Sequence, residues 1–170
     1  VFFLHFSFLN AEIVNNIEIE GNSRISNETI KVYGGIQSIN KDFTKKDLDE
    51  ILKNLYDTNF FETVNLEIKN NTLFVSLKEY PLINNLLITG EQTKKFKEEI
   101  QKIIKTKENG SYVESDLKQD ITTIKNLYSS IGYNFSKIEP KIRVIDENNV
   151  DLVINIERGE ITKIAKINFT

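Results

Sequence analysis

The chain has 170 residues, a formal net charge of −3 and no cysteine. Without cysteine it has no disulfide framework, no thiol nucleophile and no zinc site of the cysteine type. Its lysine and glutamate residues are interspersed, which argues against a nucleic-acid-binding surface, because such a surface needs a clustered basic face. A hydrophobic fraction of 39% and a charged fraction of 28% indicate a globular chain rather than a disordered one.

The segment at residues 1–9 is rich in Phe and Leu and carries no formal charge. It is too short to span a membrane, which takes about 20 apolar residues. It resembles the end of the apolar region of a secretory signal peptide, with Ala11 as the small residue at the cleavage point. We therefore expect residues 1–11 to be the remnant of a signal peptide, with an apolar first strand as the alternative.

A first unit of one strand, two helices and a hairpin is expected over residues 12–80. Its opening strand, 14–19, is apolar and ends at the turn signal Gly21-Asn22. Ser26 is a preferred N-cap for a short helix, and Gly34-Gly35 is expected to end that helix.

The second helix of this unit starts with a capping box formed by Thr44 and Asp47. Two strands of alternating apolar and polar residues follow, at 64–69 and 73–77, and Asn70-Asn71 between them tolerates the positive φ of a tight turn. The apolar residues of the helix recur at helical spacing and lie on one face: Leu48, Ile51, Leu52 and Leu55.

The same order of elements returns over residues 81–160, which predicts a second unit. Val14–Gly21 is repeated about 70 residues later as Ile83–Gly90. A longer helix is expected to end near Asn109-Gly110, and Ser111–Glu114 reads as the capping box of the next helix. The inward faces of these two helices carry Phe96, Ile100, Ile103 and Ile104, then Leu117, Ile121, Ile124 and Leu127.

Pro140 predicts the order of the strands in the sheet. Proline cannot donate a hydrogen bond to a neighbouring strand, so it belongs on an edge strand or at a strand end. The second strand of each unit is therefore expected at an edge, and the third, 150–156 in the second unit, at the centre. The predicted fold class is α+β, in which each β-α-α-β-β unit has a three-stranded mixed sheet with two helices on one face.

A third copy of the opening strand is expected over residues 161–170. A unit that is repeated in tandem is a module of an array, so the function should belong to the array rather than to one catalytic centre.

The residues favour a binding protein, and we expect the chain not to be an enzyme and to need no cofactor or metal. The only histidine, His5, lies in the expected signal remnant, so the mature chain lacks a Ser-His or Cys-His pair. Gly34-Gly35 has neither the spacing nor the lysine of a phosphate-binding loop. Carboxylates such as Asp47 and Glu114 occupy helix N-terminal turns, where the backbone dipole favours acidic residues.

Aromatic residues follow the second helix of each unit, at Phe60-Phe61 and at Tyr133 and Phe135. We interpret them as plugs of the core at the junction of helix and sheet. A peptide-binding groove is the alternative.

Three motifs of the first unit resemble a known module. They are Ile-x-Ile-x-Gly-Asn at 17–22, Leu-Tyr-x-Thr-x-Phe-Phe-x-x-Val at 55–64 and Lys-Glu-Tyr-Pro-x-Ile at 78–83. Together they are similar to the polypeptide-transport-associated (POTRA) domains of the BamA family of outer-membrane protein assembly factors. The second unit departs from the pattern at Glu91, where the opening motif has Asn.

The resemblance implies that the chain holds the first two POTRA domains and the start of a third, on the periplasmic side of the bacterial outer membrane. In the family such arrays receive unfolded outer-membrane proteins from periplasmic chaperones and dock assembly lipoproteins. Contact with the membrane is expected only through a C-terminal barrel that lies outside this sequence. The alternatives are the POTRA region of a two-partner secretion or TamA-like transporter, and an FtsQ-type envelope scaffold.

The edge strands are the expected binding sites, because an extended peptide can pair with their free backbone groups whatever its side chains. The alternative is that Glu67, Lys69, Lys141 and Arg143 keep the edges unpaired. The residues of the two expected edges are Val64, Asn65, Leu66, Glu67, Ile68, Lys69, Lys141, Ile142, Arg143, Val144 and Ile145.

Overall fold

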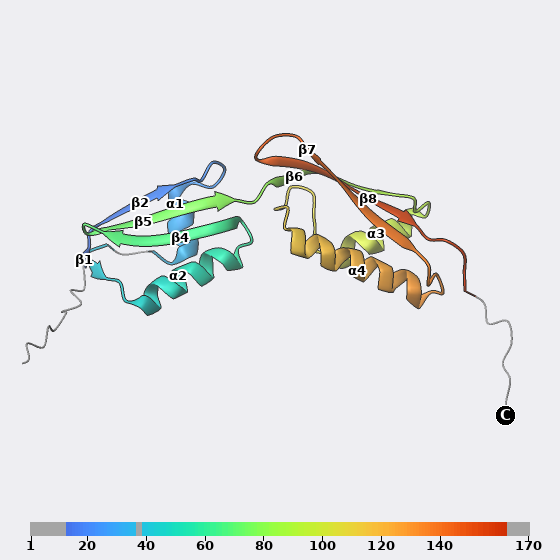
Figure 1. Cartoon of the computed structure of the whole chain (residues 1–170), viewed down its shortest axis with the longest axis horizontal. Coiled ribbons are helices and arrows are strands. Elements are labelled where there is room, and N and C mark those ends of the chain that lie inside the picture. The colour runs from blue at the N-terminus through green and yellow to red at the C-terminus, as the bar shows by residue number, and fades with distance from the viewer. Residues whose placement is uncertain (1–12, 37–38, 163–170) are drawn as a thin grey trace, which may run out of the picture. The chain divides into compact units, whose positions relative to one another are not determined.

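The computed structural model describes residues 13–36 and 39–162. The expected signal remnant at 1–11 and all but the first two residues of the expected third-unit strand lie outside the described residues. The chain divides into two compact units between Glu79 and Tyr80, which are coloured blue to green and green to red in Figure 1.

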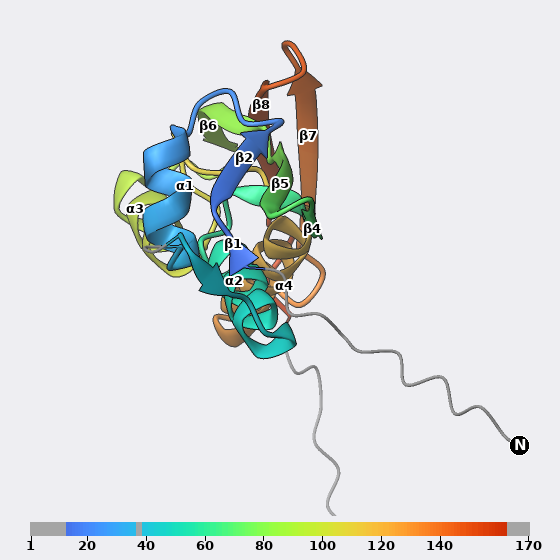
Figure 2. The same ribbon diagram turned by 90° about the vertical axis from the view of Figure 1, so that its left-hand side faces the viewer.

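The sheet of the first unit has the order β2-β5-β4. Strand β2 (Asn16–Glu20) runs parallel to β5 (Thr72–Glu79), and β4 (Phe61–Lys69) pairs with β5 in the antiparallel sense. The helices α1 (Asn27–Gly34) and α2 (Lys45–Asp57) lie against one face, and Figure 2 shows α1 beside β2. The short pair β1 (Ile13–Val14) and β3 (Lys41–Asp42) was not expected from the sequence.

Local interactions of the expected kind set the ends of these elements. The Ser26 hydroxyl accepts the N–H of Thr29 at 3.2 Å, and Gly35 ends α1 in the left-handed region with φ of 71°. Both hydrogen bonds of the capping box between Thr44 and Asp47 are present. The turn at Asn70-Asn71 has φ of 50° and 60°, so these predictions are confirmed.

The second unit repeats the topology with the order β6-β8-β7. Strand β6 (Leu82–Thr89) is parallel to β8 (Asn149–Glu157), and β7 (Lys137–Val144) is antiparallel to it. The helices α3 (Lys94–Ile103) and α4 (Glu114–Ser130) lie on one face of this sheet. The predicted fold class, the two edge strands and the two central strands are confirmed.

Each unit has its own apolar core between sheet and helices. The first core is formed by Val14, Ile30, Ile36, Ile51, Leu55, Phe61, Val64, Leu73, Val75 and Leu77. The second is formed by Ile83, Ile88, Ile100, Ile104, Leu117, Ile124, Tyr128, Ile138, Val150, Leu152, Ile154 and Ile156.

Three expectations for the helices of the second unit are wrong, and one of them concerns Ile103, which was expected to face inward but is 44% exposed. Helix α3 ends at Ile103 rather than near Asn109, because the buried Asp120 accepts the backbone N–H groups of Lys105 and Thr106 and holds them outside the helix. Helix α4 has Val113 as its N-cap without a side-chain hydrogen bond. Ser111 forms no capping box because its backbone pairs with Leu82.

Among the residues that the structure describes, no helix has the length and apolar character needed to cross a membrane.

Candidate peptide-binding edges

Alternate residues of β4 direct their backbone N–H and C=O groups away from the sheet. Lys69 and Thr72 flank the two-residue turn and face each other, so in an antiparallel hairpin of this kind they form a hydrogen-bonded pair. Alternation then directs the N–H and C=O groups of Val64, Leu66 and Ile68 outward. Asn65, Glu67 and Lys69 direct theirs to β5.

The same reasoning applies to β7. The N–H of Ile145 donates to the carbonyl of Asn149 at 3.0 Å, so Arg143 and Lys141 bond inward to β8 and Ile142 and Val144 face outward. Pro140 stands opposite Ile154 at an outward-facing position. Its lack of an N–H therefore costs the sheet no hydrogen bond.

The two edges differ in the side chains that they expose. In β4, Val64 is buried and Leu66 and Ile68 are half-buried. In β7, Ile142 is 44% exposed and Val144 is 71% exposed. The second edge therefore offers apolar surface next to its outward-facing backbone, whereas the first offers mainly the backbone.

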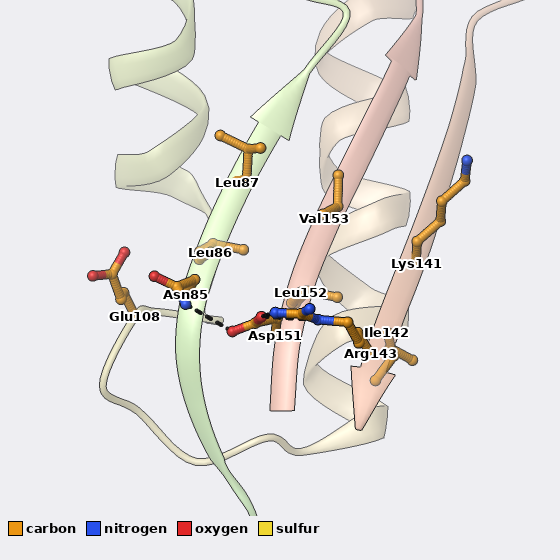
Figure 3. Close-up of a pocket in the computed structure, with 10 residues that line it drawn as sticks. All are labelled: Asn85, Leu86, Leu87, Glu108, Lys141, Ile142, Arg143, Asp151, Leu152 and Val153. Carbon is orange, nitrogen blue, oxygen red and sulfur yellow. Dashed lines mark hydrogen bonds and ion pairs between the residues drawn. The ribbon is translucent and has the colours of Figure 1, made fainter. Parts of the chain in front are cut away.

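A hollow of about 570 Å³ adjoins the second edge, lined by residues of all three strands and by Glu108. Figure 3 shows Leu87, Val153 and Lys141 on its near side, from neighbouring positions of β6, β8 and β7. Leu87 is 56% exposed although it is apolar. The open face of this sheet is thus apolar at Leu87 of β6 and Val153 of β8, and charged at Lys141 where it reaches the β7 edge.

Asp151 organises the polar end of the hollow. Its carboxylate accepts from Asn85 at 2.8 Å and from Nε of Arg143 at 3.1 Å, so it joins all three strands (Figure 3). The hydrogen bond from Arg143, followed by that from Asn85, holds the pKa of Asp151 below its usual range. Arg143 is therefore held in an ion pair with Asp151 of the neighbouring strand, while Lys141 forms no ion pair within the described part of the chain.

The aromatic residues do not share one role. Phe61 is buried in the first core, with Phe60 packed against it edge to face at 6.3 Å. Tyr133 packs against Tyr128 at 6.2 Å. Phe135 is 78% exposed, so the interpretation as a core plug is wrong for this residue, which follows α4 beyond the reach of the core.

A buried carboxylate fixes the loop after the opening strand in the first unit. Glu79, at the end of β5, accepts the backbone N–H groups of Ser23, Arg24 and Ile25 at 2.9 to 3.1 Å. The Arg24 side chain adds an ion pair at 2.9 Å. This anchor ties β2 to the strand that leads into the second unit.

The second unit has a buried carboxylate at the same junction, but it comes from the loop. The two junctions correspond, because in each unit the glycine after the opening strand lies against the third strand: a Cβ on Gly21 would meet the carbonyl of Leu77, and one on Gly90 would meet that of Ile156, each at 1.9 Å. Two residues after Leu77 comes Glu79, whereas two residues after Ile156 comes Arg158. The second unit therefore has an arginine where the first has its glutamate.

Glu91, one residue after Gly90, supplies the carboxylate of the second unit and accepts from Tyr128 at 2.6 Å and from the N–H of Thr93 at 2.8 Å. The motif departure at Glu91 is thus a buried anchor that the sequence alone did not reveal.

Comparisons with known proteins bear on the fold and the family of the chain. Residues 81–159 match the family model POTRA, described as a surface antigen variable number repeat. Curated relatives named outer membrane protein assembly factor BamA, from Neorickettsia risticii and Neisseria meningitidis serogroup B, are 28% and 27% identical over 163 and 159 residues. These alignments cover 96% and 92% of this chain.

The chain spans about a fifth of the length of these curated relatives, 22% and 20%. Among solved structures, the N-terminal domain of Omp85 from Thermosynechococcus elongatus superposes with a TM-score of 0.53 at 16% identity, over 92% of this chain and 72% of that one. Residues 81–159 thus match a POTRA family model, and the chain as a whole is similar to the fifth that it spans of two curated proteins named outer membrane protein assembly factor BamA.

Proposed function

We propose that this chain is the periplasmic scaffold region of an outer-membrane protein assembly factor and that it binds unfolded outer-membrane proteins by strand addition. The BamA relatives support the assembly role. The observation that carries the binding mode is the β7 edge, where Ile142 and Val144 combine outward-facing backbone with exposed apolar side chains. Docking of chaperones and assembly lipoproteins, the two remaining partner classes, rests on the family resemblance alone.

The edge supplies enough hydrogen bonds for weak capture. Ile142 and Val144 each offer an N–H and a C=O, and Pro140 adds one C=O. About five hydrogen bonds at roughly 1 kcal/mol net each act against an association cost of at least about 4 kcal/mol. The dissociation constant is then near millimolar or weaker, which suits a protein that passes its substrate on.

The same geometry supports the proposed substrate class. Strands of outer-membrane barrels alternate apolar and polar residues over about ten residues. Such a strand, added to β7, would place alternate side chains next to Lys141, on the β7 side of the hollow. Its other side chains would lie next to Ile142 and Val144.

Titration of the isotope-labelled chain with a barrel-strand peptide tests this proposal. Chemical-shift changes should be largest at the amides of Ile142 and Val144 of β7 and smaller at the outward-facing amides of β4. The matched control is the same peptide with N-methyl groups on alternate residues, which keeps the side chains and removes the backbone donors. If neither edge responds to millimolar peptide, or if the methylated peptide acts equally well, strand addition is rejected.

A further inference from the structure

Tyr56 of the first unit touches the backbone of the neighbouring edge strand. It lies in the last turn of α2 and is 43% exposed. Its hydroxyl accepts the N–H of Val64 at 3.0 Å and lies 3.5 Å from the carbonyl oxygen of the same residue. A side chain of the helix layer thus satisfies a backbone group that belongs to the sheet edge.

The register of β4 shows what this contact does. Val64, Leu66 and Ile68 are the residues whose N–H and C=O groups face away from β5. An added strand would pair with these same groups. With Val64 engaged by Tyr56, complete outward-facing pairs remain at Leu66 and Ile68, toward the Asn70-Asn71 turn.

We propose that Tyr56 is a specificity-determining residue of the first edge, which closes that edge at Val64 and restricts an added strand to Leu66 and Ile68. This inference rests on the proposed function, since it defines the register of the peptide that the edge accepts. A peptide that pairs farther along β4 has to displace the hydroxyl from Val64 first.

In the second unit the corresponding tyrosine does not reach the edge strand. The buried residues four positions apart are Ile51 and Leu55 in α2, and Ile124 and Tyr128 in α4. Tyr128 therefore points into the core and not to the edge, although both tyrosines end the same Lys-Asn-Leu-Tyr sequence.

At the β7 edge, Pro140 withholds the outward donor instead. The open positions there are Ile142 and Val144, nearer the hairpin turn. Each edge thus keeps two residues with both backbone groups open, and the limit is set by Tyr56 at β4 and by Pro140 at β7.

Hydrogen exchange of the Val64 amide tests the contact without any peptide. In the Tyr56→Phe variant we expect this amide to exchange at least about five-fold faster, which corresponds to one hydrogen bond of about 1 kcal/mol. Tyr33→Phe is the matched control, because Tyr33 is 47% exposed and its hydroxyl has no hydrogen bond within the described residues. Equal exchange of Val64 in wild type and Tyr56→Phe would overturn the proposal.

Peptide titration then tests the register. In the wild type the barrel-strand peptide should shift the amides of Leu66 and Ile68 and leave Val64 unchanged. In Tyr56→Ala, which removes the ring as well, the response should extend to Val64 and binding should tighten about five-fold. A wild-type response at Val64 equal to that at Leu66 would contradict the inference.

The outcomes separate the two proposals. If no variant responds to peptide at β4 or β7, the proposed function fails, and Val64 exchange still decides whether Tyr56 closes the edge.

Discussion

Tyr128 donates its hydroxyl hydrogen to the carboxylate of Glu91 across 2.6 Å inside the second unit. Burial of the hydroxyl, and then the hydrogen bond to Glu91, raise the pKa of Tyr128 above its ordinary value. Burial alone would raise the pKa of Glu91, but the hydrogen bonds from Tyr128 and Thr93 outweigh it and lower that pKa. Glu91 is therefore a charged, hydrogen-bonded anchor of the loop after β6.

Tyr128→Phe should destabilise the second unit by about 1–3 kcal/mol, because it removes one donor from a buried carboxylate and keeps the ring. Urea denaturation followed by circular dichroism measures the loss. Tyr133→Phe is the control, since that ring packs against Tyr128 but its hydroxyl has no hydrogen bond in the described part of the chain. Equal stability of the two variants would show that Glu91 does not depend on Tyr128.

Glu79 should make the stability of the first unit depend on pH. Its burial tends to raise its pKa, but the backbone N–H groups of Ser23, Ile25 and Arg24 and the charge of Arg24 lower it overall. The folded state then binds fewer protons than the unfolded state, so its stabilisation is present above the ordinary glutamate pKa of about 4.3. It is lost as the pH falls through the lower folded pKa.

Thermal melts of wild type and Glu79→Gln between pH 3 and 7 check this dependence. The variant should be less stable at pH 7 by about 1–3 kcal/mol and should lose less on acidification. Glu50→Gln, an exposed glutamate of the same unit, should follow the wild-type curve. A Glu79→Gln curve parallel to wild type throughout would refute the assignment.

Asp120 should contribute more to stability than its neighbour Asp116. The buried Asp120 carboxylate accepts from Lys105 and Thr106 N–H groups at 2.7 and 2.8 Å. Asp120→Ala leaves both donors without their acceptor and should cost about 2–3 kcal/mol. Asp116→Ala removes a surface ion pair at 3.3 Å and should cost less than about 1 kcal/mol. Urea midpoints of the two variants should differ accordingly.

Pro140→Ala should lengthen the open edge of β7. It adds an outward-facing N–H beside Ile142, and one further hydrogen bond of about 1 kcal/mol tightens barrel-strand peptide binding about five-fold. Pro81→Ala changes the other proline of the chain, which lies outside β7, and should leave the affinity unchanged. The same gain in both variants would point to a general effect on the chain rather than to the edge.

The features that sequence predicted well depend on local pattern. Alternation along 64–69 and 73–77 fixed the hairpin, and Pro140 correctly placed its strand at an edge, because a missing N–H is a local property. Helix faces such as that of Leu48 to Leu55 followed from spacing alone. These rules need no knowledge of what each residue packs against.

The features that could not be predicted from the sequence depend on contacts between residues that are far apart in the chain. The end of α3 is set by Asp120, 15 residues beyond Lys105. The anchor at Glu91 needs Tyr128, 37 residues away. Helix α4 begins late because Tyr112 donates its N–H to the Pro81 carbonyl. The outward direction of Val64 and its contact with Tyr56 likewise require the register of the folded sheet.

The opposite origins of the two buried carboxylates limit how such units can be recombined. In the first unit the acid stands on the last strand and its cation, Arg24, on the loop. In the second the acid Glu91 stands on the loop and Arg158 on the exit. A hybrid that joined the loop of the second unit to the last strand of the first would bring Glu79 and Glu91 together at one buried junction. Single loops and strands of the two units are therefore not interchangeable, although the units share one topology.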